Sequence, residues 1–185
     1  MILVKKDEKM KYAIVYLLKG RVGKYQENIE VKLSKKFKIR NLTKRIAPHL
    51  TLKTPFEKKN IDEIERFLDK FSKKRKKFKI RVGGFGSFRK KVIYLNVLAN
   101  KDYLKFQKDL IKNLRNNKLI YIGKIDTDYM SHSTIGFAKN HVQFERIMNF
   151  LVQYNPNFTI DLDSIAILKK LKNRWVLYKE FNLRR

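Results

Sequence analysis

The sequence lacks several residue types on which common functional sites depend. It contains no cysteine, which excludes disulfides, thiol catalysis and cysteine-rich zinc sites. With only three prolines and seven glycines it has no linker-like or low-complexity stretch, so one domain over residues 1–185 is expected. The longest apolar run, residues 12–18, is far too short to span a bilayer, and no secretory signal is visible. A cytoplasmic protein without membrane attachment is predicted.

Acidic residues are also few relative to basic ones. The chain has 45 Lys and Arg against 17 Asp and Glu, a net charge of +28. Charge of this size attracts polyanions and predicts salt-dependent association with nucleic acid. The excess is spread along the chain, with a peak at "KKRKKFK" (73–79) and no separate basic tail. The alternative is a lysine-rich solvated surface, so the charge supports a nucleic-acid partner without specifying one.

Histidine is scarce, yet two of the three histidines share a short motif. His49 in "APHLTLKTPF" and His132 in "SHSTIGF" are each followed two residues later by a threonine, Thr51 and Thr134. Residues i and i+2 of a strand project from one face, so each histidine is expected to point with its threonine. A lone histidine on a strand is more often structural, but the recurrence favours a functional interpretation.

This pair of motifs suits acid-base chemistry on phosphate. Histidine is the side chain whose ordinary pKa lies near neutrality, so two facing imidazoles can act together. One accepts a proton from a nucleophile while the other donates a proton to a leaving oxygen. The short, stiff threonine hydroxyl beside each histidine suits hydrogen bonding to a non-bridging phosphate oxygen.

The two motifs occupy matching places in a repeated order of expected elements. Each half reads strand, helix, His-x-Thr strand, helix, strand, over about residues 11–88 and 91–170, and one terminal strand follows at about 173–182. The sequence therefore predicts an α+β fold with a pseudo-twofold duplication. Two similar lobes with antiparallel-rich sheets would each present a histidine across a central cleft.

Individual signals refine this outline. Asn60, Asn100 and Asn140 are each expected to cap the start of a helix. The stretch "FKIRVGGFGSF" (78–88) predicts a strand with a bulge at its glycines, and it lacks the Lys-Ser/Thr ending of a phosphate-binding loop. The stretch "FTIDLDSIAIL" (158–168) predicts one continuous strand.

Two neighbours of the motifs carry further expectations. Strand alternation places Lys53 on the face of His49 and Thr51, where a cation would stabilise negative charge on phosphate. A generic surface lysine is the alternative. Leu50 can face the core, whereas Ser133, at the equivalent position of the second motif, fits an apolar core less well.

Two aromatic residues and the third histidine flank the second motif. Tyr129 and Phe137 can stack on a nucleobase, although core packing is the favoured expectation for Phe137. His141, just inside an expected helix, has no motif partner and is interpreted as structural. No carboxylate-histidine cluster at ligand spacing suggests a metal site.

The repeated motif resembles that of a known family. The tetrapeptides "HLTL" and "HSTI" resemble the two His-x-Thr/Ser-x signatures of the 2H phosphoesterase superfamily, and within it the 2′-5′ RNA ligase-like branch of bacteria and archaea. The stretches "PHLTLKTPF" and "VGGFGSFRKKVIYLNV" are similar to further family segments. The resemblance extends over about residues 10–183.

The resemblance implies a fold, a chemistry and roles for individual residues. It implies a two-lobed, LigT-like fold that works without metal or cofactor, with the two histidines as acid and base and the two threonines binding phosphate. Many relatives carry Arg, Lys or Tyr five residues after the second histidine, where this chain has Phe137. Lys139 is a candidate substitute for that missing contact.

The implied activity is hydrolysis of 2′,3′-cyclic phosphate on RNA ends or nucleotides, with 2′-5′ RNA ligation as its reverse. One alternative is cleavage of 2′-5′ oligoadenylate or of cyclic oligonucleotide messengers in immune signalling. Another is an RNA-binding module that retains the fold without catalysis, which the +28 charge supports. A monomer acting on RNA or an oligonucleotide is expected.

Overall fold

Helices and strands alternate along the chain largely in the order that the sequence predicts. The computed structural model describes residues 9–128 and 130–185. Its elements are β1 (Met10–Leu17), α1 (Gly20–Phe37), β2 (His49–Lys58), α2 (Asp62–Lys73), β3 (Phe78–Phe88), β4 (Val92–Leu98), α3 (Lys101–Asn116), α4 (Lys124–Thr127), β5 (His132–Phe137), α5 (His141–Leu151), β6 (Asn157–Leu162), β7 (Ser164–Leu171) and β8 (Arg174–Asn182).

The expected asparagine caps are present at two helix starts. The Oδ1 atom of Asn100 accepts the amide hydrogen of Tyr103 at 2.9 Å, and the Oδ1 atom of Asn140 accepts that of Gln143 at 2.9 Å. Each bond satisfies an amide that has no partner within the first turn of its helix. Asn60 lies one residue farther out than expected, because α2 begins at Asp62 and Ile61 is its N-cap.

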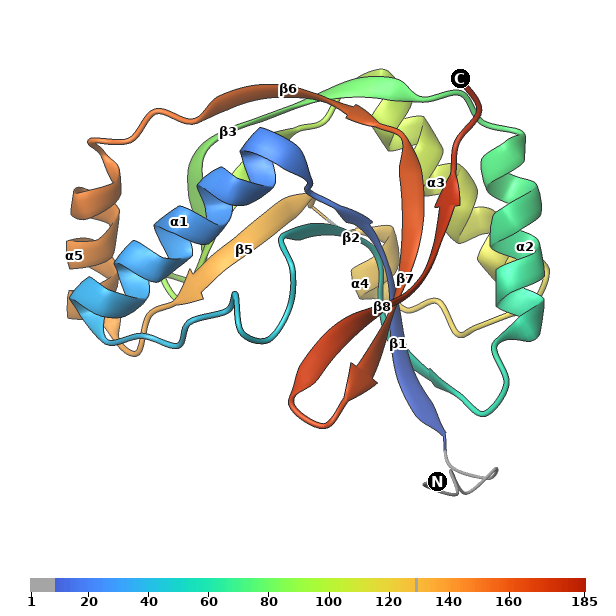
Figure 1. Ribbon diagram of the computed structural model, residues 1–185, viewed down its shortest axis with the longest axis horizontal. Coiled ribbons are helices and arrows are strands. Elements are labelled where there is room, and N and C mark those ends of the chain that lie inside the picture. Colours follow the sequence, from blue (N-terminus) through green and yellow to red (C-terminus); the bar gives the residue numbers. More distant parts are fainter. Residues whose placement is uncertain (1–8, 129) are drawn as a thin grey trace.

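Two four-stranded antiparallel sheets form the framework (Figure 1). The His49 sheet has the strand order β2-β1-β7-β8, and the His132 sheet has the order β5-β4-β3-β6. This arrangement confirms the predicted α+β fold with two antiparallel sheets.

The lobes are not the contiguous halves 11–88 and 91–170, because β3 and β7 each pair in the sheet of the other half. A tight hairpin explains the position of β3. Its two turn residues, Arg89 and Lys90, both have positive φ, 49° and 50°. This is the geometry of a two-residue turn that places adjacent strands side by side, so β3 pairs with β4.

The stretch 158–168 forms two strands in different sheets, and the prediction of one continuous strand is wrong. Leu162 of β6 pairs with Phe78 of β3, whereas Ser164 of β7 pairs with Asn182 of β8. The chain therefore leaves the His132 sheet and enters the His49 sheet within two residues. As a consequence, two terminal strands, β7 and β8, follow the second half instead of one.

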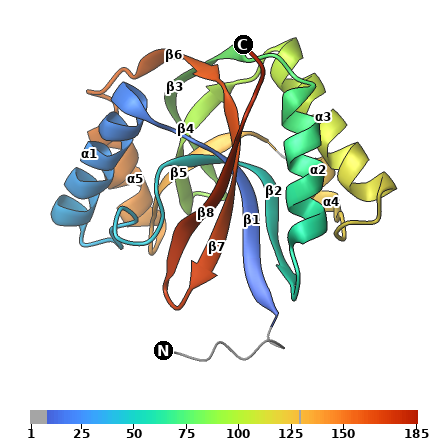
Figure 2. The same cartoon turned by 45° about the vertical axis from the view of Figure 1, so that its right-hand side comes forward.

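The helices cover the outer faces of the sheets. Helices α1 and α5 lie on one side of the molecule and α2 and α3 on the other (Figure 2). Helix α1 follows β1 of the His49 sheet but packs against β5, and α3 follows β4 of the His132 sheet and packs against both β3 of that sheet and β2 of the other. One apolar core spans both sheets and includes fully buried Ile14, Leu33, Leu50, Ile93 and Leu110. Burial of each such side chain contributes roughly 1.5–3 kcal/mol.

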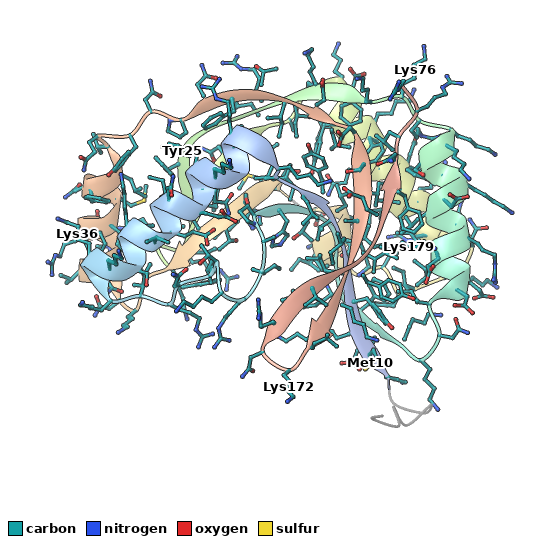
Figure 3. The ribbon with its side chains drawn as sticks, viewed as in Figure 1. Met10, Tyr25, Lys36, Lys76, Lys172 and Lys179 are labelled. Atoms are coloured by element: carbon teal, nitrogen blue, oxygen red, sulfur yellow. The ribbon has the colours of Figure 1, made fainter. Side chains whose placement is uncertain are left out.

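Basic side chains are distributed over the whole surface. The labelled lysines lie far apart, at the end of α1 (Lys36), before β3 (Lys76), in the β7–β8 turn (Lys172) and on β8 (Lys179) (Figure 3). The positive charge therefore belongs to the molecule as a whole. Within the part of the chain that the structure describes, no helix is long and apolar enough to cross a membrane.

Candidate active site

Both His-x-Thr motifs begin edge strands. His49 starts β2 and His132 starts β5, which are edge strands of the two sheets. In each motif the histidine and threonine are partly exposed, whereas the residue between them is fully buried. The structure thus places each histidine with its threonine on the sheet face opposite the shared core, as strand alternation predicts.

The two imidazoles are held in the same way. The Nδ1 atom of His49 lies 2.9 Å from the Ala47 carbonyl oxygen, and the Nδ1 atom of His132 lies 2.7 Å from the Met130 carbonyl oxygen. A carbonyl oxygen only accepts, so Nδ1 carries the hydrogen in both rings. In the neutral rings Nε2 then carries the lone pair, and it is the atom that can exchange protons with a substrate.

Burial lowers the pKa of both histidines. For His49 the loss of hydration is the largest cause, the bond to Ala47 opposes it, and the charge of His132 lowers the pKa further. For His132 burial lowers the pKa and the bond to Met130 opposes the shift. Both rings therefore favour the neutral form near pH 7, and a charge on His132 disfavours protonation of His49.

An aliphatic surface adjoins the first motif. Across the β1–β2 ladder, Leu17 pairs with His49 and Val15 pairs with Thr51. Directly opposed residues of an antiparallel pair share a face. Leu17 and Val15 belong to a small buried cluster that also includes residues of β7, so this apolar surface accounts for part of the burial of His49.

Aromatic rings adjoin the second motif instead. The ring of Phe88 meets the imidazole of His132 edge-on, with centroids 4.8 Å apart, and the ring of Tyr94 lies 5.1 Å away. Neither ring is among the site residues expected from the sequence. The period-two pattern of "VIYLNVL" held a usable signal, because Ile93 and Leu95 face the core and Tyr94 must face the opposite side.

Glycine on β3 makes room for this aromatic surface. A Cβ atom on Gly86 would lie 2.5 Å from the Tyr94 ring, so only glycine lets the ring lie across the strand. The expected bulge is present between Val82 and Phe85, where Gly84 has a φ of 68°. The glycines of this strand thus serve backbone shape and ring packing.

Three polar groups remain available beside the imidazoles. The hydroxyls of Thr51 and Thr134 make no hydrogen bond to any residue described by the structure, and neither does the side-chain amide of Asn96. Asn96 lies directly opposite His132 on the adjacent strand, so it shares the face of that histidine. Asn96, which follows Tyr94 at the same period of two, is likewise not among the site residues expected from the sequence.

The structure places Lys53 on the wrong face for the role predicted from alternation. Val15 pairs with Thr51 but Ile14 pairs with Lys53, so the register shifts by one residue between them. The shift turns Lys53 to the core face of Ile14. There its side chain is only 3% exposed, and its Nζ atom lies 3.1 Å from the Oδ2 atom of Asp126.

The buried Lys53–Asp126 pair ties β2 to α4. Asp126 also accepts the hydroxyl and the amide hydrogen of Thr54, at 2.6 and 3.1 Å. Burial by itself raises the pKa of Asp126, but the Thr54 hydrogen bond and the charge of Lys53 lower it overall. Asp126 is therefore ionised at neutral pH, and its contacts with Lys53 and Thr54 hold α4 against β2.

Three of the remaining candidates lie between the end of β5 and the start of α5. Phe137 ends β5 and is 43% exposed, so the expectation of core packing is wrong. Lys139 is exposed in the turn before α5. Tyr129 lies outside the described residues. The Nε2 atom of exposed His141 is 3.4 Å from a Glu145 carboxylate oxygen on the same helix.

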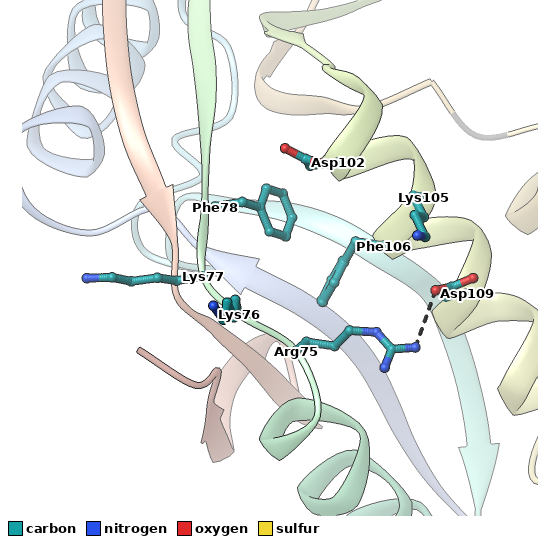
Figure 4. Close-up of a pocket in the computed structure, with 8 residues that line it drawn as sticks. All are labelled: Arg75, Lys76, Lys77, Phe78, Asp102, Lys105, Phe106 and Asp109. Carbon is teal, nitrogen blue, oxygen red and sulfur yellow. Dashed lines mark hydrogen bonds and ion pairs between the residues drawn. The ribbon is translucent and has the colours of Figure 1, made fainter.

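A separate hollow lies between the end of α2, the start of β3 and α3 (Figure 4). It is lined by Arg75, Lys76, Lys77, Phe78, Asp102, Lys105, Phe106 and Asp109. The guanidinium of Arg75 is 3.3 Å from the carboxylate of Asp109, so part of its charge is neutralised. None of these side chains is a histidine or a threonine. Elsewhere, too, the described residues include no group of three or more His, Cys, Asp or Glu placed to hold a metal ion.

Comparison with known sequences assigns the chain to a family. A sequence model of the 2′-5′ RNA ligase superfamily matches residues 24–174. A protein of Geobacillus sp. (strain WCH70), provisionally named a phosphoesterase, is 27% identical over 177 residues, which cover 93% of this chain and 95% of that protein.

Solved structures share the fold. A phosphoesterase crystal structure aligns with a TM-score of 0.64 at 13% identity, covering 96% of this chain and 100% of that chain. The structure of E. coli LigT complexed with 3′-AMP aligns with a TM-score of 0.61 at 13% identity, again over 96% and 100%. The fold, and a sequence match that extends over most of the chain, lead to one assignment: the chain belongs to the 2′-5′ RNA ligase superfamily of 2H phosphoesterases.

Proposed function

We propose that this protein is a phosphodiesterase that hydrolyses 2′,3′-cyclic phosphates on RNA ends or nucleotides by two-histidine acid-base catalysis. The observation that carries the proposal is the matched arrangement of His49 and His132. Each ring donates its Nδ1 hydrogen to a backbone carbonyl and keeps Nε2 for the substrate. General acid-base catalysis needs this orientation. With the hydrogen held on Nδ1, Nε2 of a neutral ring is free to accept a proton, and Nε2 of a protonated ring can donate one.

The chemistry balances with these two groups alone. The neutral histidine takes a proton from water at Nε2 while the water oxygen forms a bond to phosphorus. The protonated histidine gives its Nε2 proton to the ribose oxygen as the bond between phosphorus and that oxygen breaks. The products are a phosphomonoester and a free ribose hydroxyl, and proton exchange with solvent restores both rings. The backbone carbonyl on each Nδ1 stabilises the protonated form of its ring, which the base becomes and the acid is at the start.

The threonines provide the phosphate contacts in this scheme. Their hydroxyls lie on the same faces as the imidazoles and make no hydrogen bond within the described part of the chain. They can therefore donate to the non-bridging oxygens as negative charge develops there. The ligand of the LigT structure, 3′-AMP, is a ribonucleotide with a terminal phosphate and supports a substrate of this class.

The substrate is tested with a panel in the presence of EDTA. An RNA ending in 2′,3′-cyclic phosphate is compared with a 2′,3′-cyclic mononucleotide, 2′-5′ oligoadenylate and a cyclic oligonucleotide, and products are resolved by chromatography. We expect opening of the cyclic phosphate, and ligation of RNA halves as the minor reverse reaction. Unchanged cyclic phosphate at every pH from 5 to 8 contradicts the proposal. Cleavage of the oligoadenylate alone assigns the activity to the alternative substrate class.

The roles of the histidines are tested by replacing each of them. His49→Ala and His132→Ala should each lower kcat by about 10²–10⁴-fold, the usual size of an acid or base contribution. His141→Ala is the matched control, because this exposed histidine lies on α5 and should leave kcat unchanged. A variant of either motif histidine with wild-type turnover contradicts the mechanism. RNA binding that survives both substitutions, without turnover by the wild type, indicates a binding module instead.

A further inference from the structure

No backbone ladder joins the two strands that carry the histidines. Strand β2 pairs only with β1, and β5 pairs only with β4, among the residues that the structure describes. His49 and His132 therefore belong to different sheets. Their relative position is not fixed by the regular hydrogen bonds that hold neighbouring strands in register. Another contact must set the spacing of the two imidazoles.

Ser133 makes a direct contact between the motifs. It stands between His132 and Thr134 and is fully buried. Its Oγ atom lies 2.8 Å from the carbonyl oxygen of His49 and 2.7 Å from Oε1 of Gln26. The single hydroxyl hydrogen is shared between these two acceptors. The polar residue that fitted an apolar core poorly in the sequence is thus a link from the second motif to the first.

Gln26 of α1 also bonds to the main chain of the second motif. Its side-chain amide is almost fully buried, and Nε2 donates to the carbonyl oxygen of Thr134 at 3.1 Å and to Oε1 of Glu30 at 2.8 Å. The Thr134 carbonyl only accepts, which assigns the orientation of the amide. Burial raises the pKa of Glu30 to about 7, and its Oε1 accepts from Gln26 whether the carboxyl is ionised or neutral.

We propose that Gln26 and Ser133 are positioning residues that set the spacing between His49 and His132. They bond to the main chain of both motifs from inside the core, where hydrogen bonds are strong because water is excluded. The proposal rests on the proposed two-histidine reaction. An error of about 1 Å in such a pair can cost about 100-fold in rate, because proton transfer depends steeply on geometry.

The link is made from one side only. The first motif has Leu50 where the second has Ser133, and Leu50 is buried among apolar side chains. Replacement of Leu50 by another apolar residue therefore tests packing, whereas replacement of Ser133 tests the link.

Ser133→Ala is the principal test, with Ser72→Ala as its matched control. Ser72 is also buried, and its Oγ atom donates within α2 to the Asp69 carbonyl oxygen at 3.1 Å. We expect Ser133→Ala to lower kcat by about 10–100-fold with KM changed less than about threefold, while both variants lose similar thermal stability. Ser72→Ala should keep the wild-type kcat. A folded Ser133→Ala protein whose kcat matches that of Ser72→Ala overturns the proposal.

A second variant and a readout without turnover separate this proposal from the proposed function. Gln26→Met preserves side-chain length and removes the amide, and it should lower kcat in the same way. The charge of His132 lowers the pKa of His49, so an NMR titration of the imidazoles reports their spacing. In Ser133→Ala the His49 pKa should rise toward its value in His132→Ala. If the His49 pKa is unchanged in both Ser133→Ala and Gln26→Met, the positioning role is overturned. This result counts even if the wild type hydrolyses no cyclic phosphate.

Discussion

The two His-x-Thr strands share their proton-handling geometry and differ in their surroundings. On β2, His49 lies beside an aliphatic cluster, and the residue after the register shift is Lys53, which pairs with Asp126. On β5, His132 lies against aromatic rings, and Ser133 replaces the apolar residue of the first motif. The common features are the histidine, the threonine, the carbonyl oxygen on Nδ1 and a register shift directly after the threonine. The histidine, the threonine and the carbonyl oxygen are the groups on which the proposed acid-base reaction depends.

The divergence has a chemical use. Two identical histidines in identical surroundings would titrate together, and neither would be favoured as acid or base. Different environments separate their pKa values, which is how paired titratable groups acquire distinct roles. Comparison of the two strands therefore bears on which histidine gives a proton and which one takes it.

The largest expected effect on stability concerns the buried ion pair between Lys53 and Asp126, which only the first motif strand has. Lys53→Met leaves Asp126 buried without its cation, and we expect a loss of about 3 kcal/mol in the free energy of unfolding. The matched control is Lys73→Met, whose exposed partner Asp69 lies at 2.7 Å and whose loss should stay below about 1 kcal/mol. Denaturant unfolding measures both. Activity per folded molecule should stay within twofold of wild type; a large loss of kcat in folded Lys53→Met would return Lys53 to the substrate site.

An intermediate effect is expected on the aromatic side of the second strand. Gly86→Ala places a Cβ atom 2.5–2.8 Å from the Tyr94 ring and the Asn96 amide, so the ring must move away from β3 and disturb His132. We expect a stability loss of about 1–3 kcal/mol, the usual cost of overpacking, together with a reduced kcat. Gly123→Ala is the control, because its new atom meets only the exposed ring of Tyr121, at 3.3 Å. Wild-type kcat in Gly86→Ala would show that the aromatic surface does not orient His132.

The smallest effect is a difference in the titration of the two histidines. The charge of His132 lowers the pKa of His49, so His132 should take up the first proton as the pH falls. If this order is found, His132 is the acid and His49 the base of the proposed reaction. An NMR titration of both imidazoles measures the order, and protonation of His49 at the higher pH would reverse the roles.

The same shifts predict how stability depends on pH. Both folded pKa values lie below the unfolded value of about 6.5, so the unfolded chain binds more protons once the pH falls below that value. Their contribution to stability is therefore present above about pH 6.5 and is lost as the pH falls through the folded pKa values. His49→Ala and His132→Ala should each weaken this loss, which thermal unfolding between pH 5 and 8 can measure.

Much of the fold was predictable because local signals and burial agree. Asn100 and Asn140 cap their helices as expected, and the order of elements follows the hydrophobic periods. Two predictions failed where one residue changed the register. The shift after Thr51 turned Lys53 from one face of β2 to the other, and the break at Asp163 sent β7 into the other sheet. A period of two cannot reveal such a shift, because the pairing partner determines it.

The sequence by itself determined the motif on which the proposed chemistry rests, two histidines and two threonines at the same spacing on two strands. That information is local, since neighbouring residues of a strand share a face wherever the strand lies. Only the tertiary structure decided which other groups surround the histidines. The contacts of Ser133 with His49, of Gln26 with Thr134 and of Tyr94 with His132 join different elements, and Ser133 and Gln26 reach residues 84 and 108 positions away. Such contacts depend on how sheets and helices pack, and no local pattern encodes them.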